Sequence, residues 1–207
     1  IERQPNWPAP QIELGLMYLQ SGEDEAALST LRRACELDPF NVRAAFSLHL
    51  IEDLAGYATV ASEHFEIRFD PESSDRALAA EMLEPLEAIH REISTALQHE
   101  PDRRTRIELM PNHSRFAVRI TGMPQIHTIA ACTGPVIAME APREGPDHFG
   151  TYNWKRVLRH EYVHTVTLSQ TRNRIPHWLT QAAAVWLEDA PRDFNTCAML
   201  APAWLAD

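Results

Sequence analysis

The chain has 207 residues, 44% hydrophobic and 23% charged, which is typical of a globular protein with one core or one core and a small helical appendage. Its formal net charge of −10 argues against a nucleic-acid partner, because neutralising phosphates requires a basic surface. No apolar run reaches the ~18–20 residues of a transmembrane helix, so no membrane span is expected.

The ends of the sequence and its cysteines say little about where the protein acts. The sequence opens on Ile1 rather than Met, so the lack of a signal peptide there leaves a cytoplasmic and a periplasmic location equally open. We expect further chain outside these residues, including beyond Asp207. The three cysteines are odd in number and far apart, which disfavours both a disulfide framework and a cysteine zinc site.

The first predicted element is a helical hairpin between about Gln11 and Pro39. Small residues at Gly15 and Ala27 would let two helices approach closely, and Gly22 would make the turn between them. The pattern resembles one tetratricopeptide repeat over about residues 8–41, matched at Leu14, Gly15, Tyr18, Gly22, Ala27, Leu31, Ala34 and Pro39. A single repeat cannot bury its apolar faces alone, so it must pack on the following domain, on further repeats or on another chain. The resemblance also implies a possible protein partner for this segment.

The hydrophobic period changes near residue 57, which we take as the boundary between a helical segment, 1–57, and a second domain, 58–207. Apolar residues alternate in some of the following segments and recur every three or four residues in others. The predicted elements are strands at 64–70, 105–110, 126–132 and 135–140 and helices at 41–56, 72–99, 153–170 and from 176 to before Pro191, with 112–119 a short helix or loop and 192–207 an uncertain tail. Mixed strands and helices after an all-helical start predict an α+β fold with an all-α front.

The predicted helix 153–170 carries an H-E-x-x-H motif at His160, Glu161 and His164. Residues four apart lie on one helical face, about 6 Å apart along the axis, so both imidazoles can reach one zinc ion. Glu161 stands beside them, where its carboxylate can take a proton from a metal-activated water. Asn153 is a suitable N-cap and places the motif in mid-helix. These parts are those of a peptide hydrolase.

A later segment strengthens this interpretation. Pro176-His177-Trp178-Leu179-Thr180-Gln181-Ala182 resembles the P-x-W-L-x-E-G segment of gluzincin metallopeptidases, and the bacterial peptidase MA-like domains in particular, which often adjoin tetratricopeptide repeats. The resemblance covers about residues 60–190. It implies a zincin-like domain with a small mixed sheet, a Zn²⁺ cofactor bound by His160 and His164, a third ligand on the second helix, and hydrolysis of peptide or protein substrates by a metal-activated water.

The chain departs from that family at the expected third ligand, where Gln181 replaces Glu and Ala182 replaces Gly. An amide oxygen brings a dipole but no charge, so it is a weaker zinc ligand than a carboxylate. Gln181 can still ligate through its oxygen. Glu188, two turns on, is an alternative ligand if the helix register differs, although a glutamate there more often orients a neighbour or faces water. A third imidazole from His177, His113 or His148 is another alternative, and the absence of stable zinc is the last.

Two functions follow from these alternatives. The intact His160, Glu161 and His164 favour a zinc-dependent peptidase. Gln181 and Ala182 favour a degenerate, catalytically weak or inactive relative that acts with its helical repeat as a protein-binding module.

The sequence also suggests where a substrate would lie. The strand at 135–140 is expected to line the cleft and to pair with an extended peptide by edge addition. The oxyanion of the tetrahedral intermediate needs a hydrogen-bond donor besides the metal, and Tyr152 and Tyr162 are the nearby candidates.

Overall fold

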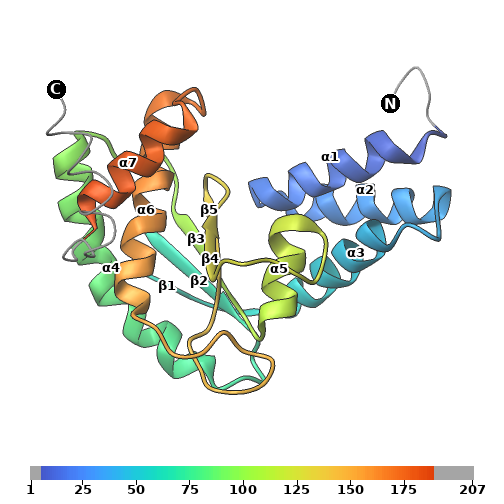
Figure 1. The fold of residues 1–207 in the computed structure, drawn as a ribbon, viewed down its shortest axis with the longest axis horizontal. Coiled ribbons are helices and arrows are strands. Elements are labelled where there is room, and N and C mark those ends of the chain that lie inside the picture. The colour runs from blue at the N-terminus through green and yellow to red at the C-terminus, as the bar shows by residue number, and fades with distance from the viewer. Residues whose placement is uncertain (1–5, 189–207) are drawn as a thin grey trace, which may run out of the picture.

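The computed structural model describes residues 6–188, which form seven α-helices and one five-stranded mixed sheet (Figure 1). The helices are α1 (Pro8–Ser21), α2 (Asp24–Leu37), α3 (Val42–Leu54), α4 (Asp75–Leu97), α5 (His113–Thr121), α6 (Trp154–Thr171) and α7 (His177–Leu187). The strands are β1 (Ala58–Ala61), β2 (Phe65–Phe69), β3 (Thr105–Met110), β4 (Ala130–Cys132) and β5 (Val136–Glu140). The mixture of helices and strands confirms the coarse fold prediction. The last helix ends at Leu187, before Pro191 as predicted, and the tail 192–207 lies outside the described residues.

The sheet has the strand order β1-β2-β3-β5-β4. The three central strands are parallel, and each edge strand runs antiparallel to its neighbour. The expectation that the strand at 135–140 offers a free edge is therefore wrong, because β5 pairs with β3 on one side and with β4 on the other. The free edge on that side belongs to β4, since the hairpin turn after Cys132 folds β5 inward.

One face of the sheet is covered by α4 and α6. Apolar side chains alternate along the central strands, as Ile67, Ile107 and Ile137 show at matched register positions. They pack on Met82 of α4 and Val163 of α6, and all five side chains are fully buried. In Figure 1 these helices lie to the left of the strands, with α7 against α6. This packing fixes α6, and with it the H-E-x-x-H motif, against the sheet.

The opposite face of the sheet carries buried charge. Arg68 and Glu108 are neighbours in register, and the buried Arg119 of α5 donates to Glu108 at 2.5 Å. Arg68 also donates to Asp24 of α2 at 2.6 Å and to the carbonyl oxygen of Leu54 at the end of α3. These charged side chains thus connect the sheet to both α5 and the N-terminal helices.

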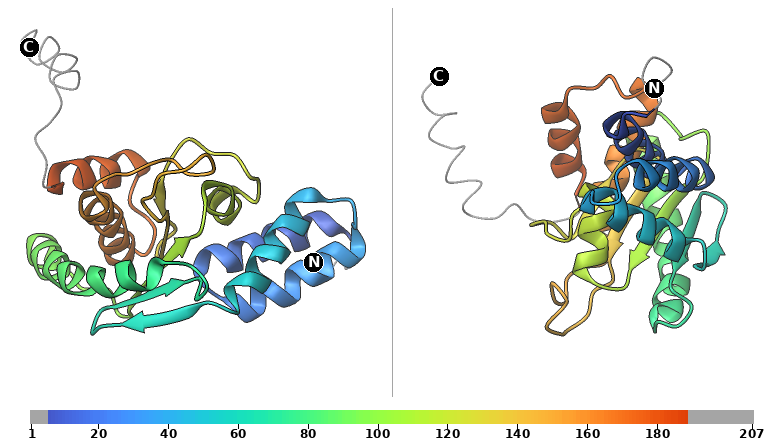
Figure 2. Two further views of the ribbon diagram at one scale, coloured as in Figure 1. Left: turned by 90° about the horizontal axis from the view of Figure 1, so that it is seen from below. Right: turned by 90° about the vertical axis from the view of Figure 1, so that its right-hand side faces the viewer.

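Helices α1, α2 and α3 pack on the body of the molecule rather than standing apart from it. Leu19, Leu31 and Leu50 share one apolar cluster with Phe116 of α5 and Ala138 of β5. The contact continues in hydrogen bonds, as from the Gln20 side chain to the Ile120 carbonyl oxygen. Figure 2 shows the three helices projecting from the side of the sheet away from α4 and α6. The sequence left open whether this segment packs on the following domain, on further repeats or on another chain. In the structure it packs on the domain that follows it.

The α1–α2 hairpin has the close approach that its small residues predict. Gly22 adopts φ +76° at the end of α1, and Ala27 is fully buried. The long helix at 72–99 is also present as α4, continuous through Pro85. The short strand β1 was not predicted. None of the helices in residues 6–188 is both long and apolar enough to cross a membrane.

Replacing Gly15 by Ala should destabilise the protein. A Cβ at this position would lie 2.7 Å from Leu31 Cγ, and Leu31 is fully buried and cannot move aside. We expect Gly15→Ala to lower the free energy of unfolding by about 1–3 kcal/mol in urea denaturation, although Ala is the better helix former. Gly56→Ala is the matched control, because its nearest neighbour would be the Asp53 carbonyl oxygen at 3.4 Å. Equal stability of the two variants would contradict the close approach.

Candidate metal centre

The motif lies in the middle of α6, as predicted. The side chain of Asn153 accepts a hydrogen bond from the Arg156 backbone N–H and caps the helix. His160 and His164 lie on one face, with ring centroids 4.9 Å apart and ring planes at 77°. The adjacent face carries Val163, which is fully buried against the sheet. Packing of the apolar face therefore turns the two imidazoles toward α7 and β4.

A chain of hydrogen bonds from α7 fixes the tautomer of His164. Thr167 Oγ1 donates to the Val163 carbonyl oxygen at 2.8 Å. Its hydrogen is thereby used, so it accepts from Thr180 Oγ1 at 2.8 Å. The Thr180 hydroxyl can then only accept from His164 Nδ1, also at 2.8 Å. This arrangement leaves Nε2 of His164 as an unprotonated nitrogen with a free lone pair.

His160 is held in the same way by the end of α7. Its Nδ1 donates to Glu188 Oε1 at 2.5 Å, while Arg156 donates to the other carboxylate oxygen at 2.9 Å. Burial raises the pKa of Glu188, but the hydrogen bonds from His160 and Arg156 outweigh it and hold that pKa below its ordinary value. A charged carboxylate accepts from Nδ1 and leaves Nε2 of His160 free, an arrangement common behind metal-bound histidines.

The surroundings also set the charges of Glu161 and His164. Burial raises the pKa of the Glu161 carboxyl, against the opposing effects of the His160 charge and the backbone N–H of Cys132. Burial, together with the charges of His160 and His177, lowers the pKa of His164 to about 4. His164 is therefore neutral near pH 7, the form that can donate a lone pair, and Glu161 is a stronger base than an exposed glutamate.

Two cavities adjoin the motif along β4. A cavity of about 510 Å³ is lined by His160, Glu161, His164, His177 and Gln181, together with Ala130, Ala131 and Cys132 of β4. A second, of about 320 Å³, meets it at Glu161 and His160 and continues past Tyr152 and Arg156 toward the start of α6. The motif thus lies where two hollows join, beside the free edge of the sheet.

The structure distinguishes among the residues that were considered as a third ligand. Gln181 and His177 line the cavity with the imidazole pair. Glu188 binds His160 Nδ1 and Arg156, on the side of the ring away from Nε2. His113 and His148 both bind the carboxylate of Glu140 instead. Within residues 6–188, no three His, Cys, Asp or Glu side chains are grouped to hold a metal ion, and the candidates that share the cavity with the pair are His177 and Gln181.

The hydroxyl groups of both tyrosines considered as oxyanion donors are engaged in other hydrogen bonds. The Tyr162 hydroxyl bonds to His90 Nδ1 at 2.7 Å on the core side of α6, where the tyrosine is 1% exposed. The Tyr152 hydroxyl donates to the Glu140 carbonyl oxygen. Burial also raises the pKa of both phenols above the ordinary value, so both remain protonated.

Sequence reasoning missed Thr180, which directly precedes Gln181. The signal that could have found it is its place three residues after His177, the first residue of α7, on a helix expected to face the motif. No family model, curated protein or solved structure matches this chain. The side chains themselves are therefore the evidence that bears on function.

Replacing Glu161 by Gln should stabilise the metal-free protein. Because the folded-state pKa is raised, ionisation of Glu161 opposes folding, and this cost grows as pH rises from the unfolded-state pKa through the folded-state pKa. At pH 7–8 in the presence of a chelator, we expect Glu161→Gln to raise the free energy of unfolding by roughly 0.5–2 kcal/mol. The difference should shrink as pH falls through the folded-state pKa and disappear well below about pH 4.3, the ordinary pKa of glutamate, where the wild-type carboxyl is neutral in both states. Glu81→Gln, an exposed site on α4, should have little effect, and an unchanged Glu161→Gln variant would contradict the buried charge.

Proposed function

We propose that this chain is a zinc-dependent peptidase domain of the gluzincin type. The observation that carries the proposal is the pair of imidazoles whose Nδ1 atoms are engaged by Thr180 and Glu188, in one cavity with the partly buried Glu161. Two histidines with fixed tautomers are suited to binding a divalent metal, since the hydrogen bonds behind the rings hold them in the ligating orientation.

The donors present fit a zinc ion. His160 and His164 would supply two neutral nitrogens, and the Gln181 amide oxygen would supply the third protein donor from α7. Zinc bound there would polarise the scissile carbonyl and lower the pKa of water in the cavity. With no carboxylate among the three donors, the affinity would be lower than that of a His₂Glu site.

The chain's own groups account for the proton transfers. Glu161 accepts a proton from the attacking water as the water oxygen bonds to the carbonyl carbon. Glu161 then passes that proton to the amide nitrogen of the substrate as the carbon–nitrogen bond breaks, which gives a carboxylic acid and an amine. Its raised pKa suits both steps, because a carboxylate that is too weak a base would not take the proton from water. The free edge of β4, beside the cavity, is suited to pair with an extended peptide backbone.

The fold agrees with the same assignment. A mixed sheet with an antiparallel edge strand beside the motif helix supports a zincin-like domain in residues 58–207. The Gly15 and Gly22 geometry of the α1–α2 hairpin supports a tetratricopeptide-type unit in residues 1–57. We infer that this unit is a structural support for the sheet, and that it can offer its outer face to a protein partner.

A protein-binding module without catalysis is the second candidate. The observation that favours it is the amide of Gln181, which would bring no charge to a metal whose other two protein donors are imidazole nitrogens. In that case, an extended peptide would still bind along β4, and Glu161 would be buried without a catalytic task.

Hydrolysis should require Glu161. With stoichiometric zinc, we expect the wild-type chain to cleave a mixture of fluorogenic peptides, and Glu161→Gln to lower kcat/KM by at least ~100-fold, because the base is removed. Bound zinc, measured by plasma mass spectrometry after gel filtration, should be unchanged in the variant. Glu81→Gln should retain wild-type cleavage. Zinc-loaded wild-type protein that cleaves no peptide, or full activity in Glu161→Gln, would overturn the proposal.

Zinc affinity should increase when a carboxylate replaces the amide. We expect Gln181→Glu to lower the Kd for zinc by roughly 10–100-fold, measured in competition with a chromophoric chelator. Changes to residues that only orient a metal ligand typically alter affinity by this much, and a direct ligand should have at least as large an effect. Gln170→Glu is the control, because it adds the same charge at the far end of α6, outside the cavity. An equal effect of both variants would mean that Gln181 is not a ligand.

A further inference from the structure

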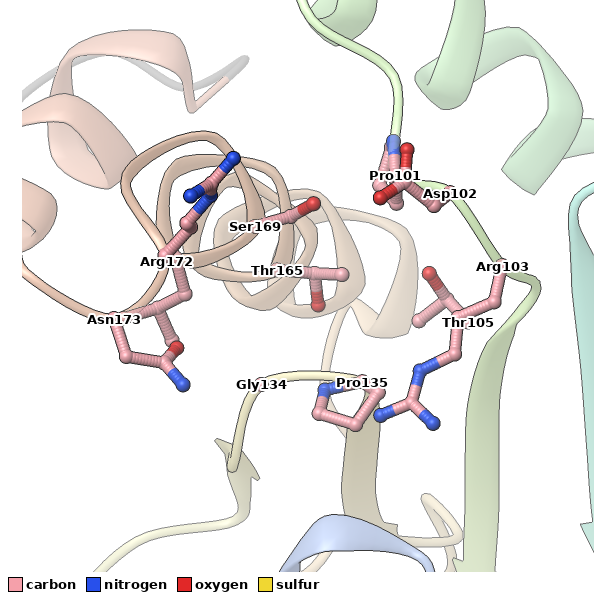
Figure 3. Close-up of a pocket in the computed structure, with 11 residues that line it drawn as sticks. Pro101, Asp102, Arg103, Thr105, Gly134, Pro135, Thr165, Ser169, Arg172 and Asn173 are labelled. Carbon is pink, nitrogen blue, oxygen red and sulfur yellow. The ribbon is translucent and has the colours of Figure 1, made fainter.

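A third cavity, of about 380 Å³, lies beyond the motif toward the end of α6 (Figure 3). Thr165 and Ser169 of α6 line one side, and Arg103 and Thr105 at the start of β3 line the other. Figure 3 shows the Arg103 side chain running across the cavity floor toward Pro135, with Arg172 at the helix end opposite. The catalytic assignment above uses none of these side chains.

This cavity follows the two cavities that adjoin the motif along α6. Leu168 lines both this cavity and the larger one that contains Glu161 and Gln181. Thr165 Oγ1, in its wall, lies 3.3 Å from the sulfur of Cys132 at the end of β4. The three cavities therefore follow one another along a single helix, and a peptide that pairs with β4 would continue past Cys132 into this one.

Its charges select an anion. Two arginines, Arg103 and Arg172, are among the residues that line the cavity, against the single carboxylate of Asp102, and Figure 3 shows their guanidinium groups on opposite sides of it. Neither guanidinium has a partner in residues 6–188, whereas other arginines such as Arg106 are paired with acidic side chains. On a chain of net charge −10, an acidic peptide needs a local cationic site to be held.

The conformation of the helix end adds to this. Arg172 ends α6 at φ +52° and Asn173 follows at φ +59°, both in the left-handed region, where Gly is the usual residue. An arginine there costs about 1 kcal/mol relative to glycine. The Asn173 amide, with no side-chain partner in the described part of the chain, adds an uncharged donor to the same wall.

We propose that this cavity is a substrate subsite for a carboxylate, which makes acidic peptides the preferred substrates; the proposal rests on the peptidase function proposed above. The distance along α6 from Glu161 to Ser169 is eight residues, or about 12 Å. An extended peptide advances about 3.3 Å per residue, so the carboxylate lies three or four residues from the scissile bond. A glutamate or aspartate side chain supplies it, as does the C-terminal carboxylate of a short peptide.

The test is a set of fluorogenic peptides in which one Glu is moved through each position on both sides of the cleavage site, in an otherwise uncharged sequence. We expect kcat/KM to rise roughly tenfold when Glu lies three or four residues away, the effect of a charge-assisted hydrogen bond. The double variant Arg103→Ala/Arg172→Ala should lose this preference and cleave the uncharged peptide as before. Arg103→Lys/Arg172→Lys should keep part of it, and Arg91→Ala, an exposed site on α4, should keep all of it. Peptides ending in a free acid or an amide at the same position separate the terminal from the side-chain carboxylate.

A binding measurement separates failure of the subsite from failure of the peptidase. Fluorescence anisotropy of the same labelled peptides is measured on the full-length Glu161→Gln chain, with and without the two arginine changes. Tighter binding of the acidic peptide that is lost with the arginines supports the subsite even if no peptide is cleaved. Cleavage with no preference for acidic peptides, or a preference that survives the double Ala variant, overturns the subsite and leaves the peptidase standing.

Discussion

The hydrogen bonds between α6 and α7 are the constraint on which the site depends. Thr180 on α7 and Glu188, the residue that follows its last turn, each hold the Nδ1 of one motif histidine. Without them, both imidazoles would be free to rotate and to exchange tautomers, and neither Nε2 would be committed to the cavity. The same helix carries Gln181 between these two residues. The register of α7 against α6 therefore sets the orientation of both imidazoles and the position of Gln181 beside them.

The other face of the sheet explains how α6 is kept in place. Glu108 and Arg119 are completely buried and lie on the side of the sheet that faces the N-terminal helices, and Arg68 joins Glu108 to Asp24 on α2. Removing one partner of a buried ion pair typically lowers the free energy of unfolding by several kcal/mol. These groups therefore hold the N-terminal helices firmly against the sheet. The helical segment thus covers a polar surface that would otherwise be exposed, while α4 and α6 cover the apolar one. This division makes the first three helices a part of the body rather than an appendage.

Local patterns in the sequence predicted the parts of the fold that depend on local forces. Asn153 caps α6, Gly22 turns between α1 and α2, and the alternation in 64–70 marks β2, because each follows from a few neighbouring residues. The motif residues were found for the same reason, since their spacing alone puts them on one face. Strand order was beyond reach: β4, rather than β5, became the edge because of pairing between β3 and β5, which are far apart in the sequence. The roles of Thr180 and Glu188, and the commitment of Tyr162 to His90, likewise depend on contacts between distant segments.

The neutral donor set has a consequence for the chemistry of the cavity. His160, His164 and Gln181 would carry no formal charge toward a divalent ion, so Glu161 and Glu188 would be the nearest compensating carboxylates. A less compensated ion binds more weakly but attracts electrons from a bound carbonyl more strongly. It also favours an anionic partner, which the substrate itself can provide. A cationic subsite at Arg103 and Arg172 and a weakly compensated ion near Glu161 would then act on an acidic peptide at two points about 12 Å apart, as measured along α6. An amide at position 181 would in this respect be compatible with catalysis, because an ion held by neutral donors polarises a bound carbonyl more strongly.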